Sequence, residues 1–145
     1  MVPALIQHCV NEIEIRGLDT LGLYRIPGPE REVKELKEKF LRGKGVLNLG
    51  KYDIHAICGC IKDFLRSLRD HLVGSWFWED FAIAADLVGP IKRQAKIERL
   101  VQDLPTPNQD TLAFLILMSS LSYEKMTWNI SYIGKGALLY EFDNA

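Results

Sequence analysis

The segment from Asp53 to Arg69 constrains the fold of this chain most strongly, because its apolar residues repeat with the period of an α-helix. The apolar positions of this segment are Ile54, Ile57, Cys58, Ile61, Leu65 and Leu68. Such a stripe covers one helix face, and aspartate at position 53 is a residue type that caps helix N-termini. This helix must bury a full side, so the rest of the chain has to supply matching apolar faces.

Further helices are predicted along the chain from apolar spacing and from proline and glycine at the ends. They run from Pro3 until Gly17, from Pro29 until Gly43, over residues 76–88, around residues 97–104, and from a cap at Asn108. In the 76–88 helix, the residues expected to face inward are Phe77, Phe81, Ala84 and Val88. No segment alternates apolar and polar residues convincingly as a half-buried strand does. The sequence therefore predicts an all-α fold.

The composition is typical of one globular domain. The chain has 145 residues, of which 48% are hydrophobic and 26% charged, and its net charge of −1 gives no overall attraction to nucleic acid or anionic lipid. No apolar run approaches the roughly 20 residues needed to cross a bilayer, and the N-terminus lacks the pattern of a secretory signal. We expect a single domain over residues 1–145, no nucleic-acid partner and no transmembrane segment.

The three cysteines are an odd number without a disulfide-framework spacing, which favours a reducing, cytoplasmic setting. Cys58 and Cys60, with His55 nearby, also suggest a metal site. On a helix, however, His55 and Cys58 share a face while Cys60 points elsewhere, so the three cannot converge on one ion. We predict buried thiols and expect neither a metal ion nor a cofactor.

A charged residue stands alone in the apolar segment 22–28, which reads GLYRIPG. Glycines bracket this segment, Pro27 stiffens it, and no carboxylate lies between Asp19 and Glu30. Arg25 would thus be held on a rigid loop, with five donors in a planar fork that suits phosphate oxygens. We interpret Arg25 as acting on the phosphates of another molecule, although the pattern alone also fits a structural or surface arginine.

The helix predicted over residues 53–69 also carries a cationic stripe. Lys62, Arg66 and Arg69 are spaced i, i+4 and i+7, about a quarter turn from the apolar stripe. Asp63 is placed to pair with Arg66 at i+3. From the pattern alone these cations are either solvated or part of a binding surface. Docking on acidic lipid headgroups, which would be a peripheral membrane contact, is one such alternative.

Three segments together resemble a RhoGAP domain: residues 22–28 (GLYRIPG), 30–36 (EREVKEL) and 62–68 (KDFLRSL). The run 36–45 is similar to a family member that acts in cytokinesis. The resemblance is strong from about Val2 to Phe81, is patchy beyond, and recovers over 104–115. It implies a helical domain that activates GTP hydrolysis by Rac, Cdc42 or RhoA, and a location at the cytoskeleton or spindle midzone.

The resemblance also implies roles for particular residues. Arg25 matches the arginine finger that such domains insert into the active site of a GTP-bound GTPase. Lys62 and Arg66 match residues that support the finger loop and the GTPase-facing groove, and Asn129 matches an asparagine on that surface. The chain would then be a GTPase activator and not an enzyme with its own active site. In agreement, Gly43-Lys44-Gly45 lacks the rest of a phosphate-binding loop motif.

The chain also departs from the family pattern. His71 stands where the family has proline, Ser120-Leu121 replaces a histidine-leucine pair, and Gly134-Lys135-Gly136 replaces a phenylalanine-glycine-proline signature. The chain ends at Ala145, before the last helices of a typical domain would be complete. These departures keep a second hypothesis open, namely a module that binds a GTPase or a scaffold without activating hydrolysis.

Overall fold

The computed structural model describes residues 1–43 and 47–119. Within these ranges the chain forms six α-helices, one short 3-10 helix and no strand. In chain order they are α1 (Ala4–Arg16), α2 (Glu30–Arg42), η1 (Leu49–Lys51), α3 (Ile54–Ser67), α4 (Trp78–Ala85), α5 (Pro90–Gln102) and α6 (Thr106–Ser119). The predicted all-α class is confirmed for this part of the chain.

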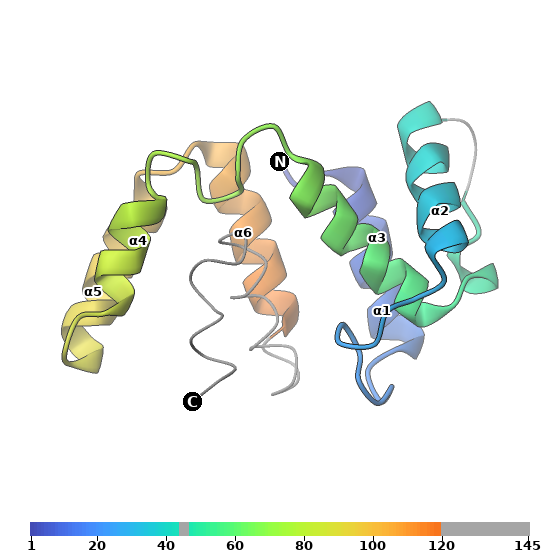
Figure 1. Cartoon of the computed structure of the whole chain (residues 1–145), viewed down its shortest axis with the longest axis horizontal. Coiled ribbons are helices and arrows are strands. Elements are labelled where there is room, and N and C mark those ends of the chain that lie inside the picture. The colour runs from blue at the N-terminus through green and yellow to red at the C-terminus, as the bar shows by residue number, and fades with distance from the viewer. Residues whose placement is uncertain (44–46, 120–145) are drawn as a thin grey trace.

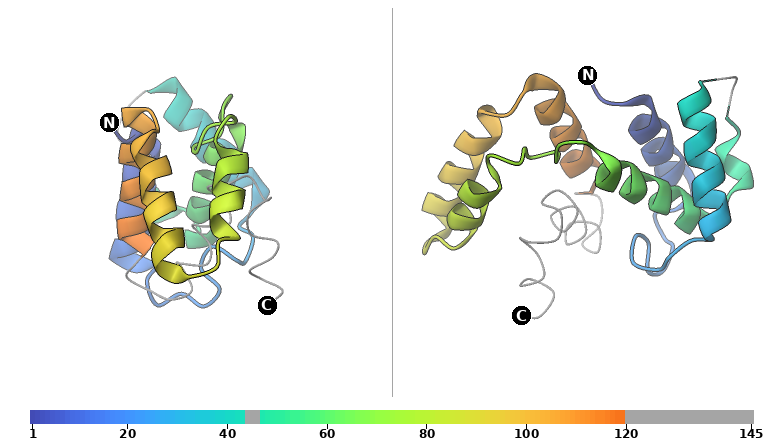
Figure 2. Two further views of the ribbon diagram at one scale, coloured as in Figure 1. Left: turned by 90° about the vertical axis from the view of Figure 1, so that its left-hand side faces the viewer. Right: turned by 45° about the horizontal axis from the view of Figure 1, so that its top comes forward.

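The helices form two groups that α6 connects (Figure 1). α3 packs between α1 and α2 at one end of the molecule, and α4 packs along α5 at the other. The right-hand view of Figure 2 shows the same separation. The N-terminal ammonium group of Met1 pairs with the Asp110 carboxylate of α6, which joins the start of the first group to α6.

The core is built around α3, as its apolar stripe predicts. The buried residues of α3 are Ala56, Ile57, Cys58, Cys60, Ile61 and Leu65. From α1, the buried residues are Leu5, Ile6, Cys9, Val10 and Ile13, which recur at helical spacing. Cys60 is buried as well, although the sequence placed it away from the apolar face, because α1 and α2 both pack against α3. All three cysteines are therefore buried thiols, as expected.

The ends of the first helices follow their predicted signals. The Asp53 carboxylate accepts a hydrogen bond from the main-chain nitrogen of His55 at 2.7 Å and so caps α3. Gly43 ends α2 in the left-handed conformation, with φ 59°. An arginine that the sequence did not single out holds the segment before α3 in place. The Arg16 guanidinium donates to the carbonyl oxygens of Leu49, at 3.1 Å, and Tyr52, at 2.6 Å.

Helical periodicity misplaced the helices of the second group. α4 is confined to Trp78–Ala85, and Val88 lies beyond its end with 93% of its surface exposed, so the inward position predicted for Val88 is wrong. α5 starts at Pro90, well before the predicted residue 97. Proline is favoured at the first helical position, and the polar residues that follow have good helix propensity although they give no apolar signal.

Two further predicted boundaries are wrong. α3 ends at Ser67, and Leu68 is already extended with ψ 134°, so Arg69 lies outside the helix. Asn108 does not cap α6, which starts at Thr106. The Asn108 side-chain amide instead donates to the Leu72 carbonyl oxygen at 2.7 Å and ties α6 to the segment after α3.

Candidate functional site

The connection between α1 and α2, residues 17–29, is called the arginine loop here because it carries Arg25. It consists of successive turns closed by main-chain hydrogen bonds. The nitrogens of Arg25 and Ile26 both donate to the Gly22 carbonyl oxygen at 2.9 Å. Gly22 and Tyr24 both have φ 68°, in the left-handed region. Glycine adopts this conformation freely, whereas an aromatic residue does so only when its surroundings hold it there.

The arginine loop is anchored by two side chains that point into the protein. Leu23 is 4% exposed and Tyr24 is 7% exposed, and both belong to the core. Burial is also the main reason why the pKa of the Tyr24 phenol is raised. Because these neighbours point inward, the segment between them and Pro27 is displayed at the surface. Leu23 and Tyr24 are therefore the apolar anchors of the loop, whereas Ile26, the third apolar residue expected to anchor it, is exposed.

Lys62 of α3 contacts the main chain of the arginine loop. Its ammonium group donates a hydrogen bond to the Tyr24 carbonyl oxygen. Partial burial lowers the pKa of Lys62, and the nearby Arg66 guanidinium lowers it further, whereas Cys58 acts in the opposite direction. The ammonium is thus drawn inward to the main chain next to Arg25, and it is not part of an exposed cationic surface.

A glycine brings the other end of the arginine loop against the start of α3. A Cβ atom built on Gly28 would lie 2.3 Å from the main-chain nitrogen of Ala56 and 2.5 Å from its Cα atom. No side chain fits there unless one of the two backbones moves. The loop is consequently fixed to α3 at two points, through Lys62 and through Gly28.

Arg25 itself projects from this framework into solvent. Its side chain is exposed, and across residues 1–43 and 47–119 its guanidinium makes no hydrogen bond or ion pair. No carboxylate of the described residues pairs with it, and the loop residues between Thr20 and Pro29 carry no other charge. A cation presented in this way has its donors available for an anionic group of another molecule.

The structure places the other predicted site residues in different environments. Arg66 is exposed on the last turn of α3, four residues after Lys62. Arg69 lies beyond the helix and Lys62 turns inward, so the continuous stripe of three cations is not present. Asp63 forms an ion pair with Lys37 of α2 at 2.7 Å, a contact between helices that the sequence did not indicate. Asn129 lies outside the described residues.

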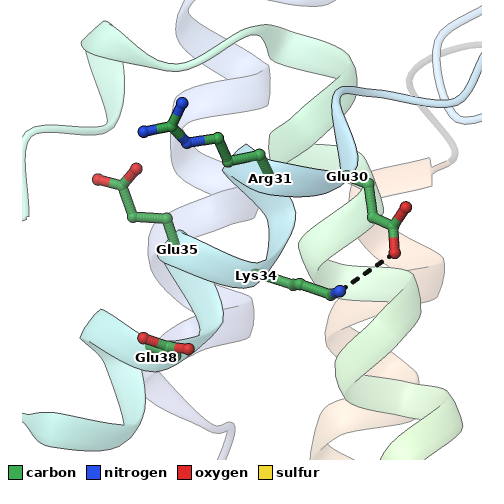
Figure 3. Close-up of a pocket in the computed structure, with 5 residues that line it drawn as sticks. All are labelled: Glu30, Arg31, Lys34, Glu35 and Glu38. Atoms are coloured by element: carbon green, nitrogen blue, oxygen red, sulfur yellow. Dashed lines mark ion pairs between the residues drawn. The ribbon is translucent and has the colours of Figure 1, made fainter.

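A hollow on the outer face of α2 does not add a second site. Figure 3 shows its lining: Glu30, Arg31, Lys34, Glu35 and Glu38, all from this one helix. Ion pairs at i, i+4 spacing form along this helix, with Glu30–Lys34 at 3.3 Å and Glu35–Lys39 at 2.6 Å. Within the part of the chain that the structure describes, no second element lines the hollow, and opposite charges pair along it. This face is a solvated helix surface, as its charge pattern predicts.

The described residues hold no group of three or more histidine, cysteine or acidic side chains arranged to bind a metal ion. Among them there is also no helix with the length and apolar character required to cross a membrane. The distinctive chemical feature of this part of the chain is therefore the arginine loop.

An arginine that one protein presents to another can stabilise the charge that develops in phosphoryl transfer on the partner. The sequence model of the RhoGAP domain matches residues 3–122. The chain belongs to the RhoGAP domain family.

Individual relatives agree with this assignment. The chain is 50% identical over 118 residues to mouse "Rac GTPase-activating protein 1", covering 81% of this chain and 19% of that protein. It is 38% identical over 117 residues to mouse "Rho GTPase-activating protein 27", covering 79% of this chain and 14% of the relative. The chain thus spans less than a fifth of the length of these curated relatives.

Solved structures share the fold. The crystal structure of human Rho GTPase activating protein 15 superposes with a TM-score of 0.77 and 28% identity, over 93% of this chain and 62% of that structure. The BH domain of GRAF, a GTPase regulator associated with focal adhesion kinase, gives a TM-score of 0.77 with 27% identity, over 88% and 70% of the two chains. The resemblance seen in the sequence is confirmed at the level of family and fold.

Proposed function

We propose that this chain accelerates GTP hydrolysis by a Rho-family GTPase, into whose active site it inserts Arg25. The observation that carries the proposal is the state of Arg25: exposed, without an ion pair among the described residues, and fixed by a loop that is braced on α3. The names of the curated relatives, which are Rac and Rho GTPase-activating proteins, support the same function.

The chemistry requires a positive charge at a defined moment. A small GTPase holds Mg²⁺, GTP and the attacking water, but it stabilises poorly the negative charge that develops between the β- and γ-phosphates. A guanidinium placed there supplies this charge in a site with little water. In the related Ras system an arginine finger is worth roughly 10³–10⁵-fold, or about 4–7 kcal/mol.

Arg25 can contribute this much only if the partner's active site excludes water from its guanidinium. An exposed ion pair contributes only about 0–1 kcal/mol, because solvent screens it and the side chains lose freedom. The main-chain turn at Gly22 and the Lys62 contact fix the loop before binding, so less ordering is needed when the partner arrives. The rigidity of the arginine loop thus supports the catalytic role.

The remaining site residues have supporting roles in this proposal. Lys62 positions the main chain beside Arg25, and Arg66 faces the GTPase from the last turn of α3. We assign Asn129 to the GTPase-facing surface on the family resemblance alone. The chain completes the active site of its partner, so we classify it as an activator that turns over no substrate of its own.

The partner and setting follow from the family. We propose a GTP-bound Rac, Cdc42 or RhoA as the partner, and the cytoplasm, with the cytoskeleton and the spindle midzone, as the location. We further propose that residues 1–145 act as a single RhoGAP-like domain. The chain covers 62% and 70% of the two solved structures, which leaves the activity of this length to be measured.

Single-turnover hydrolysis of GTP by Rac, Cdc42 and RhoA, with and without the chain, tests the proposal. We expect stimulation of at least one GTPase, a loss of about 10³-fold or more in Arg25→Ala, and little rescue by Arg25→Lys because lysine lacks the planar fork. Arg31→Ala, which removes an exposed arginine from α2, is the matched control and should retain full stimulation. Equal stimulation by Arg25→Ala would remove the arginine from the mechanism.

The same experiment addresses the second hypothesis. Binding to a GTP-loaded GTPase without faster hydrolysis would identify a non-activating binding module. Docking of the Lys62, Arg66 and Arg69 side chains on acidic lipid is less favoured, because these cations do not form one exposed stripe.

A further inference from the structure

The arginine loop exposes large aliphatic side chains beside its one charge. Leu21 is 77% exposed, Ile26 43% and Leu18 41%. Single exposed aliphatic residues are common on protein surfaces and need no explanation. These three are different because they lie within eight positions of one another on the same loop as Arg25. We call Leu18, Leu21 and Ile26 the apolar rim.

The backbone holds part of the apolar rim together. A Cβ atom built on Gly22 would lie 2.6 Å from Cδ1 of Ile26 and 2.7 Å from its Cγ1, so Ile26 lies directly over Gly22, the neighbour of Leu21. The nitrogens of Arg25 and Ile26 share the Gly22 carbonyl oxygen. Arg25 and Ile26 therefore belong to one closed turn, and Leu21 lies in the preceding turn, which the hydrogen bond from the Leu23 nitrogen to the Thr20 carbonyl oxygen closes at 3.3 Å.

The neighbours of the apolar rim show that its exposure is selective. Leu23 and Tyr24, which stand between Leu21 and Ile26 in the chain, are buried in the core and anchor the loop. Leu23 and Tyr24 thus stabilise the loop, whereas Leu21 and Ile26, which precede and follow Arg25 in the chain, stay exposed. Exposed aliphatic groups next to a cation suit a partner surface of a particular kind. Such a surface has an anionic group at its centre and apolar side chains around that group.

An apolar surround has a definite use at such a site. Residues that ring the centre of an interface exclude water and so strengthen the polar contacts inside the ring. We propose that Leu21 and Ile26 contact an apolar surface of the GTPase beside its nucleotide and exclude water from the Arg25 guanidinium. This inference rests on the proposed function. It gives Leu21 and Ile26 the role of excluding water from the guanidinium, which the proposed function requires.

Leu21 is the cleaner probe of the two residues. Its side chain is mostly exposed in the free chain, so its replacement should leave the fold unchanged. Ile26 covers Gly22 and would confound binding with loop structure. Val88, at 93% exposure between α4 and α5, offers a matched aliphatic residue at the other end of the molecule (Figure 1).

The test compares the unmodified chain with Leu21→Ser, Leu21→Met and Val88→Ser. Two quantities are measured: affinity for the GTPase loaded with a non-hydrolysable GTP analogue, and the half-saturating concentration in single-turnover hydrolysis. We expect Leu21→Ser to lower the affinity about tenfold and to raise the half-saturating concentration about tenfold. Effects of this size are typical of an interface residue of moderate importance. Leu21→Met, which keeps an apolar side chain, should lose much less affinity than Leu21→Ser. Val88→Ser should match the unmodified chain, and thermal melting should be the same for all four.

The outcomes separate this inference from the proposed function. If hydrolysis is stimulated but Leu21→Ser binds and acts like the unmodified chain, the inference is overturned and the proposed function stands. If the unmodified chain binds without stimulating hydrolysis and Leu21→Ser weakens binding, Leu21 does contact the partner and the proposed function fails. If the unmodified chain neither binds nor stimulates Rac, Cdc42 or RhoA, both are overturned.

Discussion

The ammonium group of Lys62 donates a hydrogen bond to the main-chain carbonyl oxygen of Tyr24, the residue directly before Arg25. Tyr24 has a left-handed backbone, with φ 68°, and its ring is buried. The lysine thus holds an unfavourable backbone conformation that aims the following side chain at solvent. The position of Arg25 depends on a contact between two segments that are 38 residues apart in the chain.

Lys62→Met tests this support. Methionine keeps an apolar stem but removes the hydrogen bond, so the loop can shift while the packing on α3 is largely retained. We expect the single-turnover rate to fall by about ten- to a hundredfold, since small displacements of a catalytic group have effects of this size. The free energy of unfolding in urea should change by no more than about 1 kcal/mol, the usual net value of one hydrogen bond.

The control for this variant is Lys51→Met, which removes an exposed lysine from η1. It should leave both the rate and the stability unchanged. A Lys62→Met chain that stimulates hydrolysis as well as the unmodified chain would show that the Tyr24 contact does not position the arginine.

Gly28→Ala tests the second attachment of the arginine loop. The added methyl group would meet the backbone of α3 at 2.3–2.5 Å, so the loop or the helix must move. We expect a loss of about 1–3 kcal/mol in the free energy of unfolding, as for other overpacked sites, together with at least about a tenfold lower hydrolysis rate. Thermal melting and single-turnover assays measure the two effects.

Gly43→Ala provides the comparison. Gly43 is left-handed with φ 59° but has no atom within 4 Å of the position of a Cβ atom. Alanine there should cost about 1–2 kcal/mol in backbone conformation and leave the hydrolysis rate unchanged. Full activity of Gly28→Ala would mean that close contact with Ala56 is not needed to place Arg25.

Asp70 gives the segment after α3 a pH-dependent contribution to stability. Hydrogen bonds from the Ser75 hydroxyl and main-chain nitrogen, and from the His71 main chain, hold the pKa of the Asp70 carboxyl below its usual value. A carboxyl group whose pKa is lower in the folded state stabilises the fold above its unfolded pKa, and the effect is lost as the pH falls through the folded value. Asp70→Ala should therefore lower the urea midpoint at about pH 7, and the difference should shrink towards about pH 3.

Asp103→Ala is the matched control, because Asp103 is an exposed aspartate at the end of α5. Its replacement should not lower the urea midpoint at about pH 7 as Asp70→Ala does, because the Asp103 side chain accepts no hydrogen bond from the described residues. A difference between Asp70→Ala and the unmodified chain that is constant with pH would contradict the assignment to the ionised carboxylate.

The sequence predicted most of the first helical group and the arginine loop. Proline and glycine mark both ends of α1 and α2, and the stripe of α3 is long enough to define its buried face. The second group was predicted less well, because α5 has few apolar residues in its first half and α4 is short. The periodicity of apolar residues predicts a helix only where that helix has a clear apolar face.

The contacts that position Arg25 could not be predicted from the sequence, for a different reason. Glycine and proline indicated a stiff loop, but nothing local indicates that an aromatic residue such as Tyr24 takes a left-handed backbone. That conformation depends on packing and on the distant Lys62. The contact of Gly28 with Ala56 and the ion pair of Lys37 with Asp63 likewise form only when separate segments meet.

The structure of this chain bound to its GTPase, with GDP and aluminium fluoride in place of the departing phosphate, tests the central claim most directly. We predict that the Arg25 guanidinium lies within about 2.7–3.2 Å of the fluoride or of the oxygen bridging to the β-phosphate. A complex in which that guanidinium points into solvent while the nucleotide site is occupied would contradict the account.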